Sequence, residues 1–165
     1  TEEDYFRIIK SKTAALISAC TACGARAVTD NAETIMLMKE FGENIGIAFQ
    51  IRDDLLDYES TGLTGKIAGN DIKERKITLP LIHALKQASF FQKKHILSIV
   101  KSRKKTKAEI NEVIAFVADN GGMVYAETRM NQYRDKALAI LDSYPDSPVK
   151  ESLKEFVHYT TERKK

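Results

Sequence analysis

Apolar residues recur every three or four positions almost throughout the chain, which is the spacing of helices that bury one face. Near the start, the residues at this spacing are Tyr5, Ile8, Ile9, Lys12, Ala15, Leu16 and Ala19. The sequence does not show the strict apolar–polar alternation of a half-buried strand. The pattern therefore predicts an all-α protein, a helical bundle built as a single helical domain over residues 1–165.

Capping signals and helix-breaking residues set the expected helix boundaries. The first helix is expected over residues 3–27, and Asp30 to Glu33 has the form of a capping box for a second helix that reaches Tyr58. Thr106 to Glu109 has the same form. Glycines and charged residues interrupt the pattern over residues 60–77, which predicts a loop. The remaining helices are expected over residues 80–88, 91–102, 107–120, 123–144 and 148–162.

Composition excludes several classes of protein. The 165 residues are 43% hydrophobic and 30% charged, as in a globular domain, and two cysteines are too few for a disulfide scaffold. The formal charge of +3 is smaller than nucleic-acid-binding proteins usually carry, so we expect no nucleic-acid partner. Because there is neither a signal peptide nor an apolar run of roughly 20 residues, we expect no membrane span and a cytoplasmic location.

The segment with candidate chemistry is residues 46–58. Asp53 and Asp57 lie four positions apart and so share a helix face, Asp54 lies beside them, and Gln50 lies one turn earlier. The flanking residues are strongly apolar, which favours carboxylates at the edge of a cavity. Carboxylate oxygens suit Mg²⁺, which completes its coordination with water and phosphate oxygens. The alternative is a solvated acidic turn that pairs with Arg52 and nearby lysines, and the DDxxD spacing alone does not decide.

The loop after this helix favours the metal interpretation. It places Lys66, Asp71, Lys73 and Lys76 among glycines close behind the acidic face. Lysines and a bridging cation together neutralise the oxygens of a diphosphate. The segment therefore indicates a diphosphate site.

Several runs together resemble the trans-isoprenyl diphosphate synthases. In their particular residues they are most similar to the bacterial octaprenyl-type polyprenyl synthases. They are Phe49–Asp57 (FQIRDDLLD), Gly65–Asp71 (GKIAGND), Lys76–Leu81 (KITLPL), Tyr5 and Lys12-Thr13-Ala14. The resemblance implies an all-α isoprenoid synthase-type bundle, a homodimer and a Mg²⁺ cofactor. It further implies condensation of isopentenyl diphosphate with an allylic diphosphate.

The resemblance also implies roles for individual residues. Asp53 is a direct metal ligand, and Asp54 and Asp57 assist directly or through water. A second group contacts the substrate: Lys12 and Lys66 hold the allylic diphosphate, and Gln50 and Thr13 line the reacting centre. Asp71 and Lys76 are weaker counterparts, which either contact substrate or order the loop.

One departure from the family limits the prediction. The family carries two aspartate-rich motifs on facing helices, and this sequence supplies one. The chain therefore resembles the C-terminal half of such an enzyme, and we expect it to be inactive alone. Two alternatives remain open: a non-catalytic diphosphate-binding subunit of the same fold, and a helical interaction domain with an incidental DDxxD.

Two further features have ordinary explanations. Cys20 and Cys23 have redox or zinc spacing, but on a helix of small residues they are expected to be packing residues. The basic run from Lys101 to Lys107 is compatible with nucleic acid or an anionic membrane. It is more typical of a solvated loop between helices.

Overall fold

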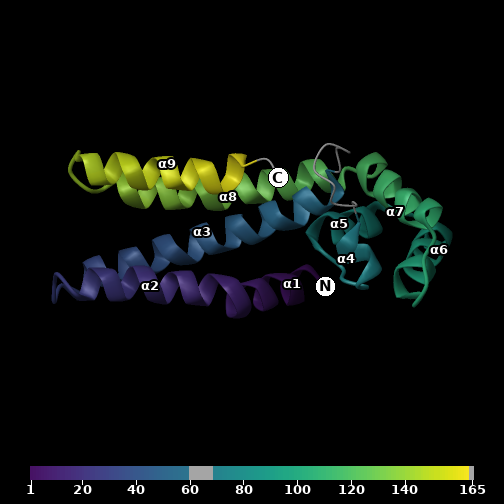
Figure 1. Ribbon diagram of the computed structural model, residues 1–165, viewed down its shortest axis with the longest axis horizontal. Coiled ribbons are helices and arrows are strands. Elements are labelled where there is room, and N and C mark those ends of the chain that lie inside the picture. Colours follow the sequence, from purple (N-terminus) through teal and green to yellow (C-terminus); the bar gives the residue numbers. More distant parts are fainter. Residues whose placement is uncertain (60–68, 164–165) are drawn as a thin grey trace. The chain divides into compact units, whose positions relative to one another are not determined.

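The computed structural model describes residues 1–59 and 69–163 (Figure 1). The elements in these ranges are helices, with no strand among them, which confirms the predicted all-α class. None of the helices in the described ranges is long and apolar enough to cross a bilayer. The chain divides into two compact units, of which one comprises Glu3–Arg52 and Thr128–Lys164, and the other Thr1–Glu2, Asp53–Glu127 and Lys165. We call them the long-helix unit and the short-helix unit.

The long-helix unit begins with three consecutive helical elements. They are α1 (Glu2–Ile9), a five-residue π-helix η1 (Lys10–Ala14) and α2 (Ala15–Arg26). They cover the helix expected over residues 3–27, but the π-helix is not among the predicted features. The unit also contains most of α3 (Ala32–Tyr58), the later part of α8 (Gly122–Asp142) and α9 (Pro148–Glu162). One buried apolar cluster of this unit consists of Phe41, Ile45, Ala137, Leu141 and Val157.

Helix α3 approaches the first helices closely because it carries glycine at the contact. A Cβ atom on Gly46 would lie 2.5 Å from the Cα of Ala14, well inside van der Waals contact. One turn earlier, a Cβ on Gly42 would lie 2.8 Å from the carbonyl oxygen of Ile17. The two backbones can therefore touch here only while both positions lack a side chain.

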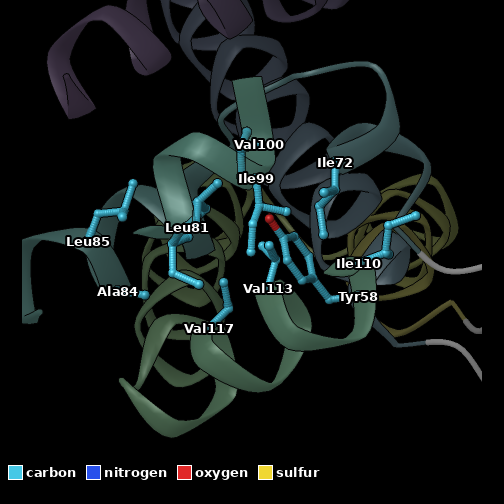
Figure 2. Close-up of a cluster of buried hydrophobic side chains, with 11 residues drawn as sticks. Tyr58, Ile72, Leu81, Ala84, Leu85, Ile99, Val100, Ile110, Val113 and Val117 are labelled. Atoms are coloured by element: carbon cyan, nitrogen blue, oxygen red, sulfur yellow. The ribbon is translucent and has the colours of Figure 1, made fainter. Parts of the chain in front are cut away.

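The short-helix unit packs shorter helices around its own core. They are α4 (Asn70–Lys73), α5 (Leu79–Gln87), α6 (Phe90–Lys101), α7 (Lys107–Asp119) and the start of α8. Tyr58, at the end of α3, enters this core (Figure 2). Its hydroxyl lies 3.2 Å from Oγ1 of Thr78. The buried cluster consists of Tyr58, Ile72, Leu81, Ala84, Leu85, Ile96, Ile99, Val100, Ile110, Val113 and Val117.

Side-chain caps fix several of the helix starts. The predicted capping box at Thr106 and Glu109 is confirmed. The box predicted for α3 is one residue too early, because the backbone N–H of Thr34 donates to Oδ1 of Asn31 at 3.0 Å. Helix α6 begins with a second complete box, formed by Ser89 and Gln92, that the sequence pattern does not predict.

The expected loop over residues 60–77 contains one further helix. Residues 60–68 lie outside the described part of the chain, and 69–77 include the single turn of α4. The two cysteines differ from expectation as well. Cys20 and Cys23 are exposed, free thiols in this chain, so the prediction that they are packing residues is wrong for it.

Candidate functional site

The three aspartates occupy the last two turns of α3. Asp54 is buried, with 5% of its surface exposed, whereas Asp53 and Asp57 are half-buried. Their apolar neighbours Ile51 and Leu55 are buried. The three aspartates therefore lie on the same helix turns as residues that face the interior. Like charges at this spacing destabilise an isolated helix. Carboxylates held in such surroundings are strong candidates for binding a cation.

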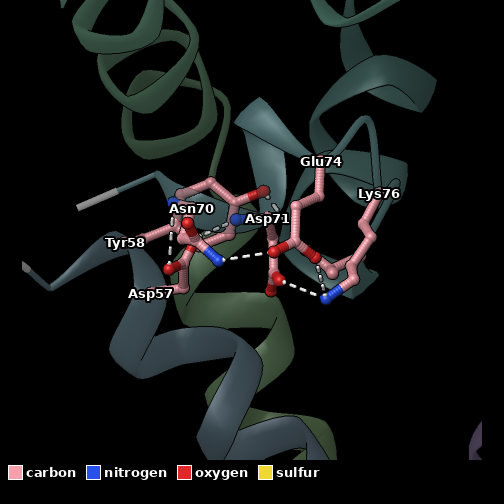
Figure 3. A network of polar contacts seen from close by, with 7 residues as sticks. Asp57, Tyr58, Asn70, Asp71, Glu74 and Lys76 are labelled. Carbon is pink, nitrogen blue, oxygen red and sulfur yellow. Dashed lines mark hydrogen bonds and ion pairs between the residues drawn. The ribbon is translucent and has the colours of Figure 1, made fainter. Parts of the chain in front are cut away.

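Asp57 caps the short helix α4. Its Oδ1 accepts a hydrogen bond from the backbone N–H of Asn70 at 3.1 Å, and its Oδ2 accepts one from the N–H of Asp71 at 2.9 Å (Figure 3). The N–H of Gly69 donates to the backbone carbonyl of Asp57 at 2.9 Å. The carboxylate thereby satisfies N–H groups that lack partners at a helix start. Asp57 thus ties the returning chain to the aspartate end of α3.

Gly69 makes this return possible. Its φ of +78° lies in the left-handed region that residues with a Cβ rarely adopt. A Cβ at this position would also collide with Cγ2 of Ile110 on α7. The position therefore requires glycine for its backbone angle and for the space it occupies.

A polar network continues from α4 into the following turn. Nζ of Lys76 lies 3.0 Å from Oδ1 of Asp71 and 2.8 Å from Oε2 of Glu74, while Nδ2 of Asn70 donates to Oε1 of Glu74 at 2.9 Å. Hydrogen bonds to Glu74 and then to Asp71 raise the pKa of Lys76 above its ordinary value. The ammonium is therefore held in its charged form. Figure 3 shows it against the carboxylates of Asp71 and Glu74.

Tyr58, the residue after Asp57, connects the end of α3 to the start of α5. Its ring is buried in the core of the short-helix unit, and burial raises the pKa of its hydroxyl well above the ordinary value. The hydrogen bond to Thr78 gives that hydroxyl a partner just before α5. Asn70, Glu74 and the Tyr58–Thr78 pair are not among the predicted residues of the region. The four-residue spacing of Asn70 and Glu74 was the available signal for one of these contacts.

A second group of predicted residues lies within the long-helix unit. Thr13, in the π-helix, donates through Oγ1 to Oε1 of Gln50 on α3 at 3.0 Å. Lys12 is exposed in the same π-helix, and Ala14 is fully buried against Gly46. A π-helix adds a residue to one turn, which changes where side chains and carbonyls point, and such turns are frequent at functional sites.

The structure thus brings the predicted residues together in two groups. Thr13 meets Gln50 in one unit, and Asp57, Asp71 and Lys76 belong to one network in the other. Gln50 and the three aspartates share helix α3. Lys66 lies outside the described residues.

The acidic end of α3 has the donor chemistry that Mg²⁺ prefers. Within residues 1–59 and 69–163, His, Cys, Asp and Glu side chains do not gather into a three-residue metal cage. Mg²⁺ ordinarily takes only one or two carboxylates and fills its remaining positions with water and phosphate oxygens. The half-buried Asp53 and buried Asp54 therefore fit a cation that arrives together with a diphosphate.

Comparison with known proteins identifies the class. The profile of the family described as polyprenyl synthetase matches residues 1–117. Octaprenyl diphosphate synthase of Escherichia coli (strain K12) is 34% identical over 164 residues, which cover 99% of this chain and 50% of that enzyme. Geranylfarnesyl diphosphate synthase of Aeropyrum pernix is 36% identical over 98% of this chain and 51% of that enzyme.

Solved structures agree with the sequence comparison. The crystal structure of geranylgeranyl pyrophosphate synthase from Bacteroides thetaiotaomicron superposes with a TM-score of 0.91 at 39% identity, covering 99% of this chain and 54% of that one. The fold and the motifs thus define a prenyl diphosphate synthase type of protein. The chain belongs to the polyprenyl synthetase family, and it spans about half the length of these relatives.

The relatives differ in the product that their names specify. Octaprenyl, geranylfarnesyl and geranylgeranyl synthases all match at similar identity. The comparisons therefore show the family. They do not distinguish the octaprenyl product that the motifs suggest from the products of the other relatives.

Proposed function

We propose that the protein containing this chain is a Mg²⁺-dependent prenyltransferase of the octaprenyl type. It condenses isopentenyl diphosphate with an allylic diphosphate to form a polyprenyl diphosphate. The observation that carries the proposal is the aspartate end of α3, where Asp57 is fixed by two backbone donors while Asp53 and Asp54 stand one turn earlier. In a member of this family, such a fixed acidic turn is suited to a metal-bound diphosphate.

Asp53 and Asp54 would hold the cation, with Asp57 positioning the turn and assisting through water. Bound Mg²⁺ would neutralise the diphosphate and so improve it as a leaving group. The contacts of Asp57 support a positioning role for it, because both of its carboxylate oxygens already accept hydrogen bonds from backbone N–H groups of α4. Asp57 would therefore contribute chiefly by holding the geometry of the turn.

Lysines would bind the diphosphate oxygens. Lys12 is exposed in the π-helix, and Lys66 belongs to the glycine-rich segment. Lys76 contributes a fixed positive charge, although its ammonium already contacts Asp71 and Glu74. Positive charges aimed at a departing anion lower the barrier most when they are positioned in advance.

Thr13 and Gln50 would line the reacting carbon. The allylic diphosphate loses its diphosphate, the double bond of isopentenyl diphosphate attacks the resulting carbocation, and a proton is then lost. Since Thr13 donates its hydroxyl hydrogen to Gln50, its oxygen lone pairs stay available to the positive charge. Their neutral oxygen dipoles can stabilise that charge without capturing it.

The chain supplies one aspartate-rich motif, so we propose that activity requires the other half of the enzyme and that the fragment is inactive alone. We further propose a homodimer, as the family resemblance suggests, and a cytoplasmic location. The second candidate function is a non-catalytic diphosphate-binding subunit of the same fold. One acidic turn suffices for that function, because a single turn can bind a metal-bound diphosphate.

Product analysis on the natural gene product separates these two functions. Farnesyl diphosphate, radiolabelled isopentenyl diphosphate and Mg²⁺ are incubated with the protein, and the products are sized by chromatography. A discrete long polyprenyl product supports the synthase and gives its chain length. Absence of incorporation, with Mg²⁺-dependent pyrophosphate binding retained, favours the non-catalytic subunit.

A further inference from the structure

The positive charges of the chain are concentrated in one segment. Residues 75–108 contain ten of the 26 Lys and Arg residues and none of the 23 Asp and Glu residues. The rest of the chain therefore carries more acidic than basic side chains, and the net charge of +3 conceals a strong asymmetry. A single-sign cluster of this size produces a local field that the net charge does not reveal.

Two adjacent phenylalanines stand exposed at the start of α6, inside this segment. Phe90 is 74% exposed and Phe91 is 82% exposed, with their ring centroids 5.8 Å apart in an edge-on arrangement. They lie between Ser89 and Gln92, the two residues of the capping box that fixes the helix start, so the rings are presented by a defined turn. Exposed aromatic side chains of this extent carry a free-energy cost in water that contact with an apolar phase would remove.

Lysines share the outward face of α6 with these rings. Ile96, Ile99 and Val100 are buried on the inner face of the helix. The opposite face carries Phe90, Lys94 four residues later, and Lys101 seven residues after Lys94. Helix α6 thus combines exposed aromatic rings at its first turn with a line of positive charge along its outer side.

Most of the basic side chains in the segment form no ion pair with another residue that the structure describes. Exceptions are Lys86, which pairs with Glu2 at 2.7 Å, and Lys76 in the polar network. Lys105 is also engaged, because its Nζ donates to the carbonyl of Ser102 at 2.7 Å. Besides Arg75, which lies before α5, the exposed basic residues that form no ion pair within the described ranges are Lys93, Lys94, Lys101, Arg103, Lys104 and Lys107.

The acidic groups on the packed neighbour α7, which lies beside α6 in Figure 1, leave this charge largely uncompensated. The carboxylate of Glu109 accepts hydrogen bonds from Thr106 in the helix cap, and Oε1 of Glu112 lies 2.7 Å from Nε2 of His95. Asp119 is the remaining acidic residue of α7. The six exposed basic side chains therefore exceed the nearby acidic ones.

We propose that the outer face of α6 and the basic turn that follows it form a docking surface for an anionic lipid membrane, with Phe90 and Phe91 entering the interface and the lysines contacting the headgroups. The combination is what peripheral membrane binding requires: a small apolar insertion together with several cationic side chains. An acidic protein partner would use the charges, but it would not by itself account for two bare aromatic rings on one fixed turn. The proposal depends on exposure and charge alone and not on prenyltransferase activity.

The test is flotation of the natural gene product with lipid vesicles. Vesicles of phosphatidylcholine with about 30% phosphatidylglycerol are compared with pure phosphatidylcholine at low and high salt. We expect binding to the anionic vesicles, with loss at high salt because the charges are screened. Phe90→Ser/Phe91→Ser and, separately, Lys93→Gln/Lys94→Gln should each weaken binding about tenfold. These positions are exposed, and circular dichroism and melting temperature verify that the variants remain folded.

A matched control variant comes from α9. Phe156 and Tyr159 are also exposed aromatics, but acidic residues accompany them on that helix. Phe156→Ser/Tyr159→Ser should leave vesicle binding unchanged. Unchanged binding by the Phe90/Phe91 variant, equal binding to neutral vesicles, or binding to polyglutamate without binding to vesicles would each overturn the proposal. Full retention of vesicle binding in a catalytically dead Asp53→Asn variant would keep the docking surface separate from the enzymatic proposal.

Discussion

The aspartate end of α3 and the outer face of α6 belong to the same unit and show opposite ways of placing charge. At the aspartate end, Asp57, Asp71 and Lys76 are each held at hydrogen-bond distance by named partners. On α6, Lys93, Lys94 and Lys101 extend into solvent without ion pairs in the described ranges. Fixed charges can act on one ligand in one orientation, whereas a diffuse field can only attract a broad surface.

The largest effect is expected for Asp53→Asn in the natural gene product. Loss of a metal-binding carboxylate should lower kcat/KM at least about 100-fold, because the substitution removes a charge that holds the cation at the leaving group. Steady-state incorporation of isopentenyl diphosphate measures it. The control is Asp119→Asn, which removes an exposed carboxylate from α7. Equal activity of the two variants would place the acidic chemistry elsewhere.

The next largest effect concerns the glycine that returns the chain to α3. Gly69→Ala should lower the free energy of unfolding by about 3 kcal/mol, since it combines a left-handed backbone with a collision against Ile110. Gly121 is a matched control, because its φ is +70° but a Cβ there meets nothing within 4 Å. Gly121→Ala should cost about 1 kcal/mol, from the backbone angle alone. Urea unfolding measures both, and equal losses would contradict the steric argument.

A smaller effect is expected from the cap of α4. Asp57→Ala removes both acceptors of the Asn70 and Asp71 amides and should cost about 1 kcal/mol, as loss of an N-cap usually does. Hydrogen exchange should accelerate at those two amides. Amides in α7 should keep their protection, since the cap is local. Unchanged exchange at Asn70 and Asp71 would show that Asp57 does not hold the turn.

The smallest effect is a pH dependence at the start of α7, on the basic side of the comparison. Hydrogen bonds from the backbone N–H and the hydroxyl of Thr106 lower the pKa of Glu109 below its ordinary value of 4.5. The charged carboxylate therefore stabilises the folded state above pH 4.5, and this contribution disappears as the pH falls through the lowered pKa. Unfolding at several pH values should show a steeper acid loss in the parent chain than in Glu109→Gln. Parallel curves would exclude the capping contribution.

The sequence predicts best those features that depend on neighbouring residues. The box at Thr106 and Glu109 needs only two side chains three positions apart, and the structure contains it. The aspartate face of α3 follows in the same way from helical spacing. The family motifs add expected roles for Lys12, Thr13 and Gln50. Two of these residues, Thr13 and Gln50, are in contact in the structure although 37 positions separate them in the sequence.

Features that depend on distant partners are not predicted from the pattern. Helix α4 forms where Asp57, 13 residues before Asn70, supplies its cap, so the local sequence gives no start signal. The π-helix lies where the backbone of Gly46 touches Ala14, a contact between segments far apart in the chain. The exposure of Phe90 and Phe91 is equally hidden, because apolar residues at helical spacing ordinarily indicate a buried face.

Calorimetric titration of inorganic pyrophosphate into the natural gene product, with Mg²⁺ and with EDTA, tests most directly whether the aspartate end of α3 is a metal site. If the aspartate end of α3 holds a metal-bound diphosphate, binding should require Mg²⁺, disappear in Asp53→Asn and persist in Asp119→Asn. Pyrophosphate binding that is independent of Mg²⁺, or that survives in Asp53→Asn, would contradict the assignment of this turn as the metal site.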